Sequence, residues 1–220
     1  MIRSEEQAVK EIESQLRGTG SWSQREDYTA ADGLDRAIGA AGPWSPVFGR
    51  TLLLHTEDAD VGVRTTAVYL LERVAKEVGA PAILKVMERS PKLFDGVKPV
   101  GHPTNQPDLR WSMLMALGTA VGPKDAAALA VLRKAAHEER GFWLLDALGR
   151  ADSAWLLANA KAVVPKDALI GALRSMPDTA SRAKLIRALG PWSAAEKKAA
   201  LASGGWALMD DAAKLKPLLE

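Results

Sequence analysis

The chain has 220 residues, of which 47% are hydrophobic and 25% are charged, a composition that suits one well-packed soluble domain. It contains no cysteine, which excludes disulfides, thiolate metal sites and a cysteine nucleophile. The formal net charge of +2 is unevenly placed, because residues 1–109 carry a net charge of −3 and residues 110–220 carry +5. The C-terminal half could therefore attract an anionic partner, although a mixed solvated surface would have the same composition.

The N-terminal residues predict a capping helix within residues 1–22. Ser4 and Gln7 have the spacing of a capping box, and Gly18 is a typical helix stop. The segment before Gly18 is acidic and amphipathic, and it lacks the basic start and apolar core of a signal peptide. No apolar run in the chain approaches the length needed to span a bilayer. We therefore expect a cytoplasmic protein with no membrane partner.

A short helical pattern recurs five times after this helix. Four copies end in a small residue, an apolar residue and glycine, and a degenerate copy ends in Leu-Leu-Glu. The residue five positions before the end of each copy is also small or apolar, so three such positions share one helix face. The ends of the copies are 31 to 46 residues apart, which predicts stacked helical hairpins. The copies end at Ala37-Ile38-Gly39, Leu70-Leu71-Glu72, Ala116-Leu117-Gly118, Ala147-Leu148-Gly149 and Ala188-Leu189-Gly190.

Residues 58–67 form the sharpest part of the pattern and read Asp-Ala-Asp-Val-Gly-Val-Arg-Thr-Thr-Ala. They resemble the start of the second helix in HEAT repeats, where an Asp-rich turn precedes Val-Arg and spaced small residues. The aspartates would cap the helix and favour its dipole, and Arg64 could reach an acidic group in the neighbouring repeat. Arg182 stands in the same register as Arg64. The resemblance to HEAT-repeat α-solenoids covers about residues 30–190 and implies an all-α superhelix of about five hairpins with capping helices.

A second internal match supports the hairpin unit. Pro123-Lys124-Asp125 begins a segment that ends at Gly149, and Pro165-Lys166-Asp167 begins one that ends at Gly190. Each Pro-Lys-Asp predicts a helix start with proline in the first turn, where its missing N–H costs nothing. Each unit is then expected to contain a first helix, a short turn and a second helix that closes with the triplet.

Two segments interrupt or follow the repeats. Residues 89–107 carry four prolines and two glycines, so they predict a loop insertion that cannot be a regular helix and could bind a partner. Residues 193–220 are expected to cap the solenoid. Ser193 and Glu196 have capping-box spacing, and a last helix is expected over residues 206–219. The whole chain, residues 1–220, would then form a single domain.

Few residues of this chain could carry chemistry. The three histidines, His55, His102 and His137, are scattered and share no metal-ligand spacing. The sequence has no phosphate-cradling glycine loop, no zinc-protease motif and no nucleophile elbow. We therefore expect no metal, no cofactor and no catalytic residue. Trp44 and Trp192 each follow Gly-Pro, and we expect their indoles to pack over the adjacent turns.

A second face of the repeat helices predicts the binding surface. In HEAT-like proteins the second helices line a concave surface, so that resemblance places the positions two, five and nine residues after the Arg64 register on its floor. These positions mix aromatic residues with cations, a combination enriched at binding hot spots. Packing against neighbouring helices would use the same residues. The predicted binding residues are Tyr69, Arg73, Trp143, Arg150, Lys184 and Arg187.

Two functions remain open at this stage. The first is a non-catalytic adaptor, scaffold or immunity-type protein that binds another protein, whose surface is acidic where it meets the C-terminal repeats. The second is DNA binding with base excision, because the predicted surface loosely resembles that of HEAT-like alkylpurine DNA glycosylases. That resemblance implies base stacking by Trp143, stabilisation of a cationic sugar by Asp146 and phosphate contact by Arg187. The net charge of +5 is small for a duplex binder, which favours protein binding.

Overall fold

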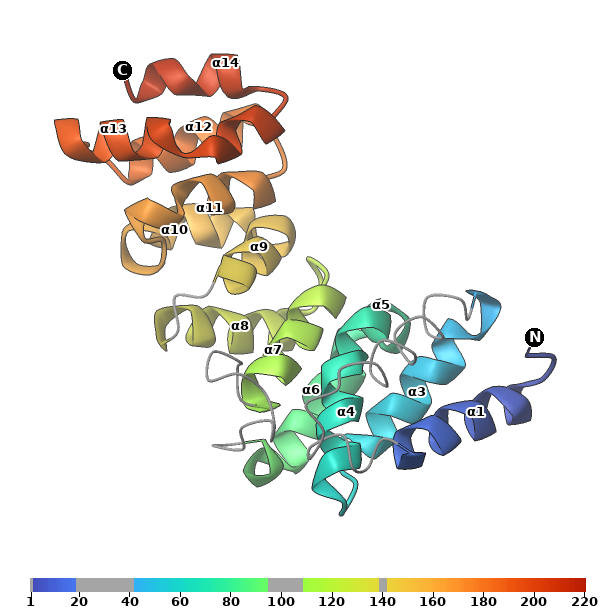
Figure 1. Cartoon of the computed structure of the whole chain (residues 1–220). Helices are drawn as coiled ribbons and strands as arrows, with labels where there is room; N and C mark the ends of the chain where they lie inside the picture. The colour runs from blue at the N-terminus through green and yellow to red at the C-terminus, as the bar shows by residue number, and fades with distance from the viewer. Residues whose placement is uncertain (1, 19–41, 95–108, 139–141) are drawn as a thin grey trace. The chain divides into compact units, whose positions relative to one another are not determined.

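The computed structural model describes residues 2–18, 42–94, 109–138 and 142–220 (Figure 1). Throughout these segments the regular elements are α-helices and short 3-10 helices, with no strand, so the expected all-α class is confirmed. Among the helices of the described segments, none has both the length and the apolar composition that a membrane span requires.

The chain divides into two compact units, Met1–Val121 and Gly122–Glu220, whereas the sequence predicts one domain. Each unit has its own buried apolar residues. The repeat copy that ends at Gly39 lies outside the described residues, as do His102 and most of the loop insertion predicted at residues 89–107.

The first helix of the first unit begins and ends where the sequence predicts. α1 (Glu5–Gly18) packs its apolar face against α3 (Ser45–His55). The Gln7 N–H donates to Ser4 Oγ over 3.2 Å, so Ser4 caps the helix. The Gln7 side chain accepts from the Arg3 N–H rather than from Ser4, over 2.9 Å.

The second predicted cap of this unit is also present. α4 (Val61–Leu71) packs against α3 and begins after Asp60. Asp60 Oδ1 accepts from the backbone N–H groups of Gly62, over 2.7 Å, and Val63, over 3.1 Å. The Asp-rich turn therefore starts a helix by the expected local mechanism.

The helical path after α4 runs further than the degenerate repeat copy predicts. It continues through η3 (Glu72–Val74) and α5 (Ala75–Val78) to Gly79, whose φ of +86° favours glycine. α6 (Ala80–Arg89), η4 (Pro91–Leu93) and α7 (Leu109–Ala120) follow, and α7 packs against α4, α5 and α6. Gly118 lies inside α7, so the last residue of this copy does not stop its helix.

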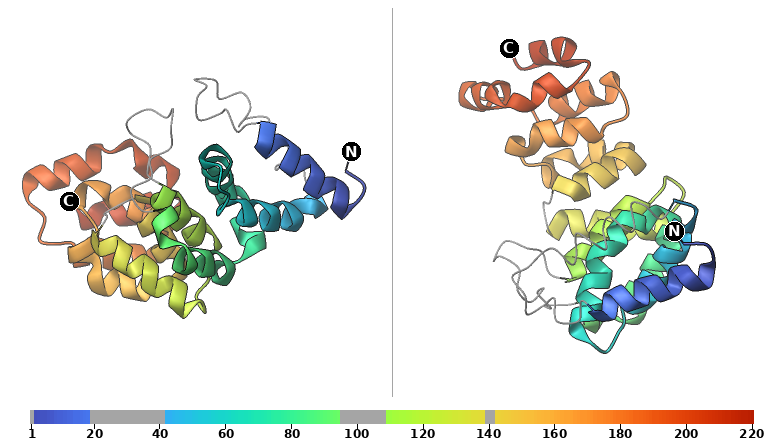
Figure 2. Two further views of the ribbon diagram at one scale, coloured as in Figure 1. Left: turned by 90° about the horizontal axis from the view of Figure 1, so that it is seen from below. Right: turned by 45° about the vertical axis from the view of Figure 1, so that its right-hand side comes forward.

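In the second unit, helices α8 to α12 contact one another in an alternating order (Figures 1 and 2). α8 contacts α9 and α10, α9 contacts α10 and α11, and α10 and α11 both contact α12. Helices α8, α10 and α12 therefore lie on one side of the unit, and α9 and α11 lie on the other. The elements are α8 (Ala126–Glu138), α9 (Phe142–Ala151), α10 (Ser153–Val163), η5 (Lys166–Ala168), α11 (Leu169–Ser175), α12 (Thr179–Ala188), α13 (Ala194–Ala202), η6 (Gly204–Leu208), α14 (Ala212–Leu215) and η7 (Lys216–Leu218).

Helix α10 changes which helices are neighbours. The hairpin pattern assigns no helix to residues 150–164, but Asp152 caps one there by accepting from the Trp155 N–H over 3.4 Å. As a result α9 and α12, which the sequence treats as equivalent second helices, lie on opposite sides of the unit. The two Pro-Lys-Asp segments also start differently, since Pro123 precedes α8 and Pro165 precedes η5 in an extended conformation.

The C-terminal residues form a capped helix followed by three short helical segments. Ser193 and Glu196 make the predicted capping box at the start of α13. The helix expected over residues 206–219 is instead divided into η6, α14 and η7. The division follows the inward packing of Trp206, which is buried and donates from Nε1 to the Ala200 carbonyl over 2.7 Å.

The predicted apolar helix face forms the core of both units. Ala67 and Met113 in the first unit and Leu144 and Leu185 in the second are fully buried. The apolar residue at the second-to-last position of each of these copies is buried too. The spacing of three and four residues therefore identified the core side of these helices correctly.

Candidate functional site

The structure places the predicted binding residues on four helical elements. In the first unit Tyr69, on α4, is 43% exposed, and Arg73, in η3, is exposed. In the second unit Trp143 is half-buried and Arg150 exposed on α9, whereas Lys184 and Arg187 are exposed on α12. Since α9 and α12 lie on opposite sides of the second unit, the pairs on these two helices do not form one stripe.

The residues of the glycosylase alternative are divided in the same way. Asp146 is half-buried one turn after Trp143 on α9, while Arg187 lies on α12. The carboxylate and the indole could therefore act on one bound group. The arginine belongs to a different surface of the unit.

Arg64 and Arg182, which share the repeat register, make hydrogen bonds to backbone carbonyls. Arg64 is 8% exposed, and its Nη1 donates to the Asp58 carbonyl over 2.7 Å, so it bonds its own turn. Arg182 donates from Nε to the Leu173 carbonyl over 3.0 Å. Its Nη1 lies 3.0 Å from Asp211 Oδ1, so this arginine does reach an acidic group of another element.

The histidines and tryptophans that the structure describes have structural contacts. His55 Nδ1 lies 3.0 Å from Asp58 Oδ2, and exposed His137 meets the Trp155 ring edge-on. Trp192 Nε1 donates to the Ile186 carbonyl over 2.9 Å, which confirms that this indole packs over the turn after α12. Trp44, at the start of α3, is half-buried. Within the described ranges no three His, Asp or Glu side chains are grouped as metal ligands.

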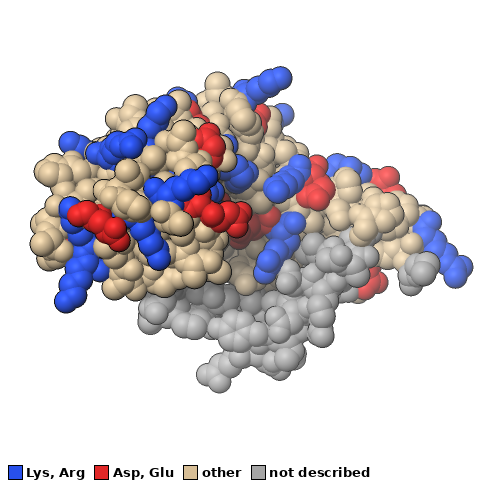
Figure 3. Space-filling view, turned by 90° about the horizontal axis from the view of Figure 1, so that it is seen from above, with Lys and Arg blue, Asp and Glu red and all other residues tan. Residues whose placement is uncertain are grey.

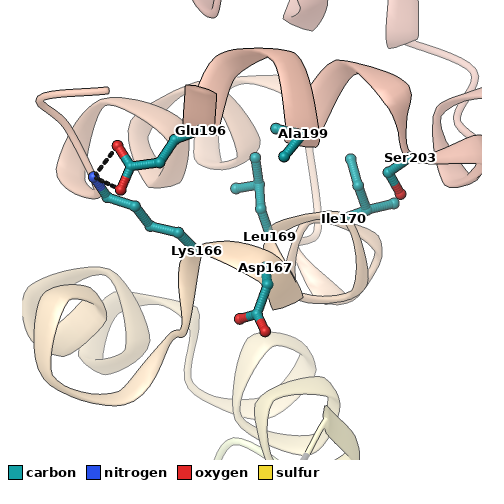
Figure 4. A pocket seen from close by; sticks show the side chains of 8 residues that line it. Lys166, Asp167, Leu169, Ile170, Glu196, Ala199 and Ser203 are labelled. Atoms are coloured by element: carbon teal, nitrogen blue, oxygen red, sulfur yellow. Dashed lines mark hydrogen bonds and ion pairs between the residues drawn. The ribbon is translucent and has the colours of Figure 1, made fainter. Parts of the chain in front are cut away.

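Three hollows adjoin one another along the second unit. The first, of about 450 Å³, lies between α10 and α12 and is lined by residues 157–162, Arg187 and Ala188. The second, of about 320 Å³, shares Lys161 with the first and reaches Lys166. We call these two together the α10–α12 hollow. The third, of about 410 Å³, shares Lys166 and extends between η5, α11 and α13 (Figure 4).

The cations of the α10–α12 hollow differ in their partners. Lys166 Nζ lies 3.0 Å from both carboxylate oxygens of Glu196 (Figure 4). The same Nζ donates to the Pro191 carbonyl over 2.8 Å. The Ser193 backbone N–H, followed by Lys166, lowers the pKa of Glu196 to about 2, so this carboxylate stays charged at neutral pH. The side chains of Lys161 and Arg187 are exposed and have no hydrogen-bond or ion-pair partner among the residues that the structure describes.

Sequence reasoning identified one of these two cations. Arg187 is a predicted binding residue, but Lys161 was not, because it lies on the unassigned helix α10. A usable signal exists in the sequence. Asp152 precedes Leu156, Ala160 and Val163, which repeat at helical spacing and are buried.

The surface charge is mixed elsewhere. On the face drawn in Figure 3, Lys and Arg side chains alternate with Asp and Glu side chains and form no continuous basic area. Comparison of the chain with protein-family models, with curated proteins and with solved structures finds no match. The function therefore has to be argued from the chemistry of the surface itself.

Proposed function

We propose that this protein is a non-catalytic binding protein, of the adaptor, scaffold or immunity type, whose partner is another protein. The observation that carries the proposal is the hollow between α10 and α12. Two exposed side chains without an ion-pair partner, those of Lys161 and Arg187, line this hollow. A concave surface that combines apolar lining with a few charged groups is the usual form of a binding site. We further propose that the helices form a HEAT-like α-solenoid, since α8 and α9 each contact both the next and the second-next helix, as such a stack requires.

The mechanism is binding by a preorganised surface. The backbone around the hollow is held by core residues such as Leu156 and Leu185, which are fully buried. Binding therefore has little cost in conformational entropy on this side of the interface, because the surface is already ordered before the partner binds. A few anchor side chains can then supply most of the affinity. Among the residues predicted from the sequence, we propose as anchors of this surface Arg187, which lines the hollow, and Lys184, which lies on the same helix.

The proposal is tested by affinity capture of the tagged full-length protein from a lysate of its source, with and without nuclease. A stoichiometric protein that survives nuclease treatment is the expected result. The variant Lys184→Ala with Arg187→Ala should lose that partner and keep its Tm, because both side chains are exposed. A partner retained equally by this variant would remove α12 from the interface.

A DNA-binding function is the second candidate, and the position of Asp146 one turn from Trp143 favours it. Capture that collapses with nuclease would lead to a base-release assay on alkylated DNA. In that case Asp146→Asn should suppress release, because a carboxylate that stabilises a cationic sugar acts through its charge. Absence of both base release and salt-sensitive DNA affinity would end this alternative.

A further inference from the structure

The α10–α12 hollow has a charge that the second unit does not neutralise. Lys161 stands in the last turn of α10 and Arg187 in the last turn of α12. The residues that line the two parts of the hollow include no Asp or Glu. Each cation interacts favourably with the C-terminal end of the dipole of its own helix. This stabilising role does not explain why both cations line the same hollow. Two cations facing a shared hollow without a carboxylate are suited to an anionic ligand.

Apart from Lys166, which is paired with Glu196, the rest of the lining is apolar or amide in character. Val164 and Leu189, which are buried, and Pro191, which is exposed, line the second part of the hollow. Asn159 donates from Nδ2 to the Trp155 carbonyl over 2.9 Å, which leaves its Oδ1 to accept an N–H from a bound chain. A ligand that fits must therefore present apolar groups and a hydrogen-bond donor together with its negative charge.

We infer that the α10–α12 hollow binds an acidic, partly apolar peptide segment of the partner, with Lys161 and Arg187 contacting its carboxylates. Apolar side chains of the segment lie against Val164, Leu189 and Pro191, and a main-chain N–H meets Asn159. This inference rests on the proposed protein-binding function and adds Lys161, together with the chemistry of the ligand.

A peptide fits these observations better than a nucleic acid does. A nucleic-acid backbone is held by a series of cations along its phosphates. Here Lys166, the third cation of the hollow, is already paired with Glu196. A phosphate chain would find two cations and an apolar base, whereas a peptide of mixed acidic and apolar side chains matches both features.

The test uses the full-length protein and a fluorescein-labelled peptide of alternating Glu and Leu, read by fluorescence anisotropy at low salt. The variant Lys161→Ala with Arg187→Ala should weaken binding about tenfold, as expected for two exposed charge contacts. The matched control is Lys198→Ala with Lys214→Ala, which removes the same charge from exposed positions that line neither part of the hollow. This control should bind as the wild type does, and both variants should keep the wild-type Tm.

Three outcomes would overturn the inference. They are an absence of binding by the Glu-Leu peptide, an equal loss in both double variants, and tighter binding of a single-stranded oligonucleotide that Lys161→Ala with Arg187→Ala abolishes. The proposed function fails separately. A native partner captured equally well by Lys161→Ala with Arg187→Ala would leave protein binding intact and remove the hollow as its site. If the peptide binds through the hollow but no protein is captured from the lysate, the hollow is kept as a peptide site and the proposed protein-binding function loses its support.

Discussion

One ion pair, whose carboxylate is buried, joins the last helices of the second unit. Asp211, at the start of α14, is 7% exposed, and its Oδ1 lies 3.0 Å from Nη1 of Arg182. Arg182 also bonds the Leu173 carbonyl, so one guanidinium connects α12 to α11 and α14. Burial raises the pKa of Asp211, but the Thr179 hydroxyl and the Arg182 guanidinium together outweigh burial and hold the pKa below its ordinary value of 3.8.

Asp211→Asn should lower the free energy of unfolding at pH 7 by about 2 kcal/mol, because it leaves the Arg182 charge without its partner. A carboxylate with a lowered pKa stabilises the fold above its ordinary pKa and loses that effect as the pH falls through its folded value. The difference between wild type and variant should therefore shrink once the pH falls below 3.8. Urea unfolding over this pH range measures it. Asp210→Asn, at the exposed neighbouring position, is the control and should change little.

At the scale of the elements, α9 and α11 approach each other through glycines. A Cβ added to Gly149 would lie 2.0 Å from Ser175 Oγ and 2.6 Å from Ser175 Cβ. One added to Gly171 would lie 2.1 Å from the Phe142 ring. The glycine that ends this repeat copy is thus needed for close helix packing, which explains why it lies inside a helix and does not stop it.

Gly149→Ala sets two effects against each other. Alanine favours a helix over glycine by about 1 kcal/mol, whereas forcing a methyl into a packed contact costs about 1–3 kcal/mol. Because the contact at Ser175 is so short, we expect the second effect to dominate and the protein to lose stability in urea unfolding. Gly204→Ala is the matched control, since its added Cβ meets no atom within 4 Å. A variant at Gly149 that is more stable than the wild type would contradict the packing described.

At the scale of the whole molecule, the chain consists of two compact units of different net charge. The division falls between Val121 and Gly122. The α10–α12 hollow and its cations lie in the second unit, within the part of the sequence that carries the basic excess. The residues needed for the proposed peptide site therefore belong to one unit.

Residues 122–220, expressed alone, should fold into a helical domain, because they form a compact unit of ordinary domain size with its own core. We expect a helical circular dichroism spectrum and a cooperative thermal transition. A fragment that shows helix but melts without cooperativity would mean that the second unit depends on residues before Gly122. The same fragment should bind the Glu-Leu peptide as the full chain does.

The sequence by itself determined the features that depend on neighbouring residues along the chain. The helical class, the buried face that includes Met113 and Leu144, and the caps at Asp60 and Ser193 all follow from spacing over one or two turns. Arg187 was recognised as a surface residue by the same reasoning. These features are local, so a single sequence is sufficient to predict them.

Only the tertiary structure decided which helices are neighbours. The insertion of α10 between two repeat copies moves α12 to the opposite side from α9, and it brings Lys161 and Arg187 to one hollow across 26 positions of sequence. The broken C-terminal helix has a similar cause, because Trp206 and Asp211 turn inward to partners elsewhere in the unit. Periodicity reports which face of a helix is buried, but it contains no information about the partner against which that face packs.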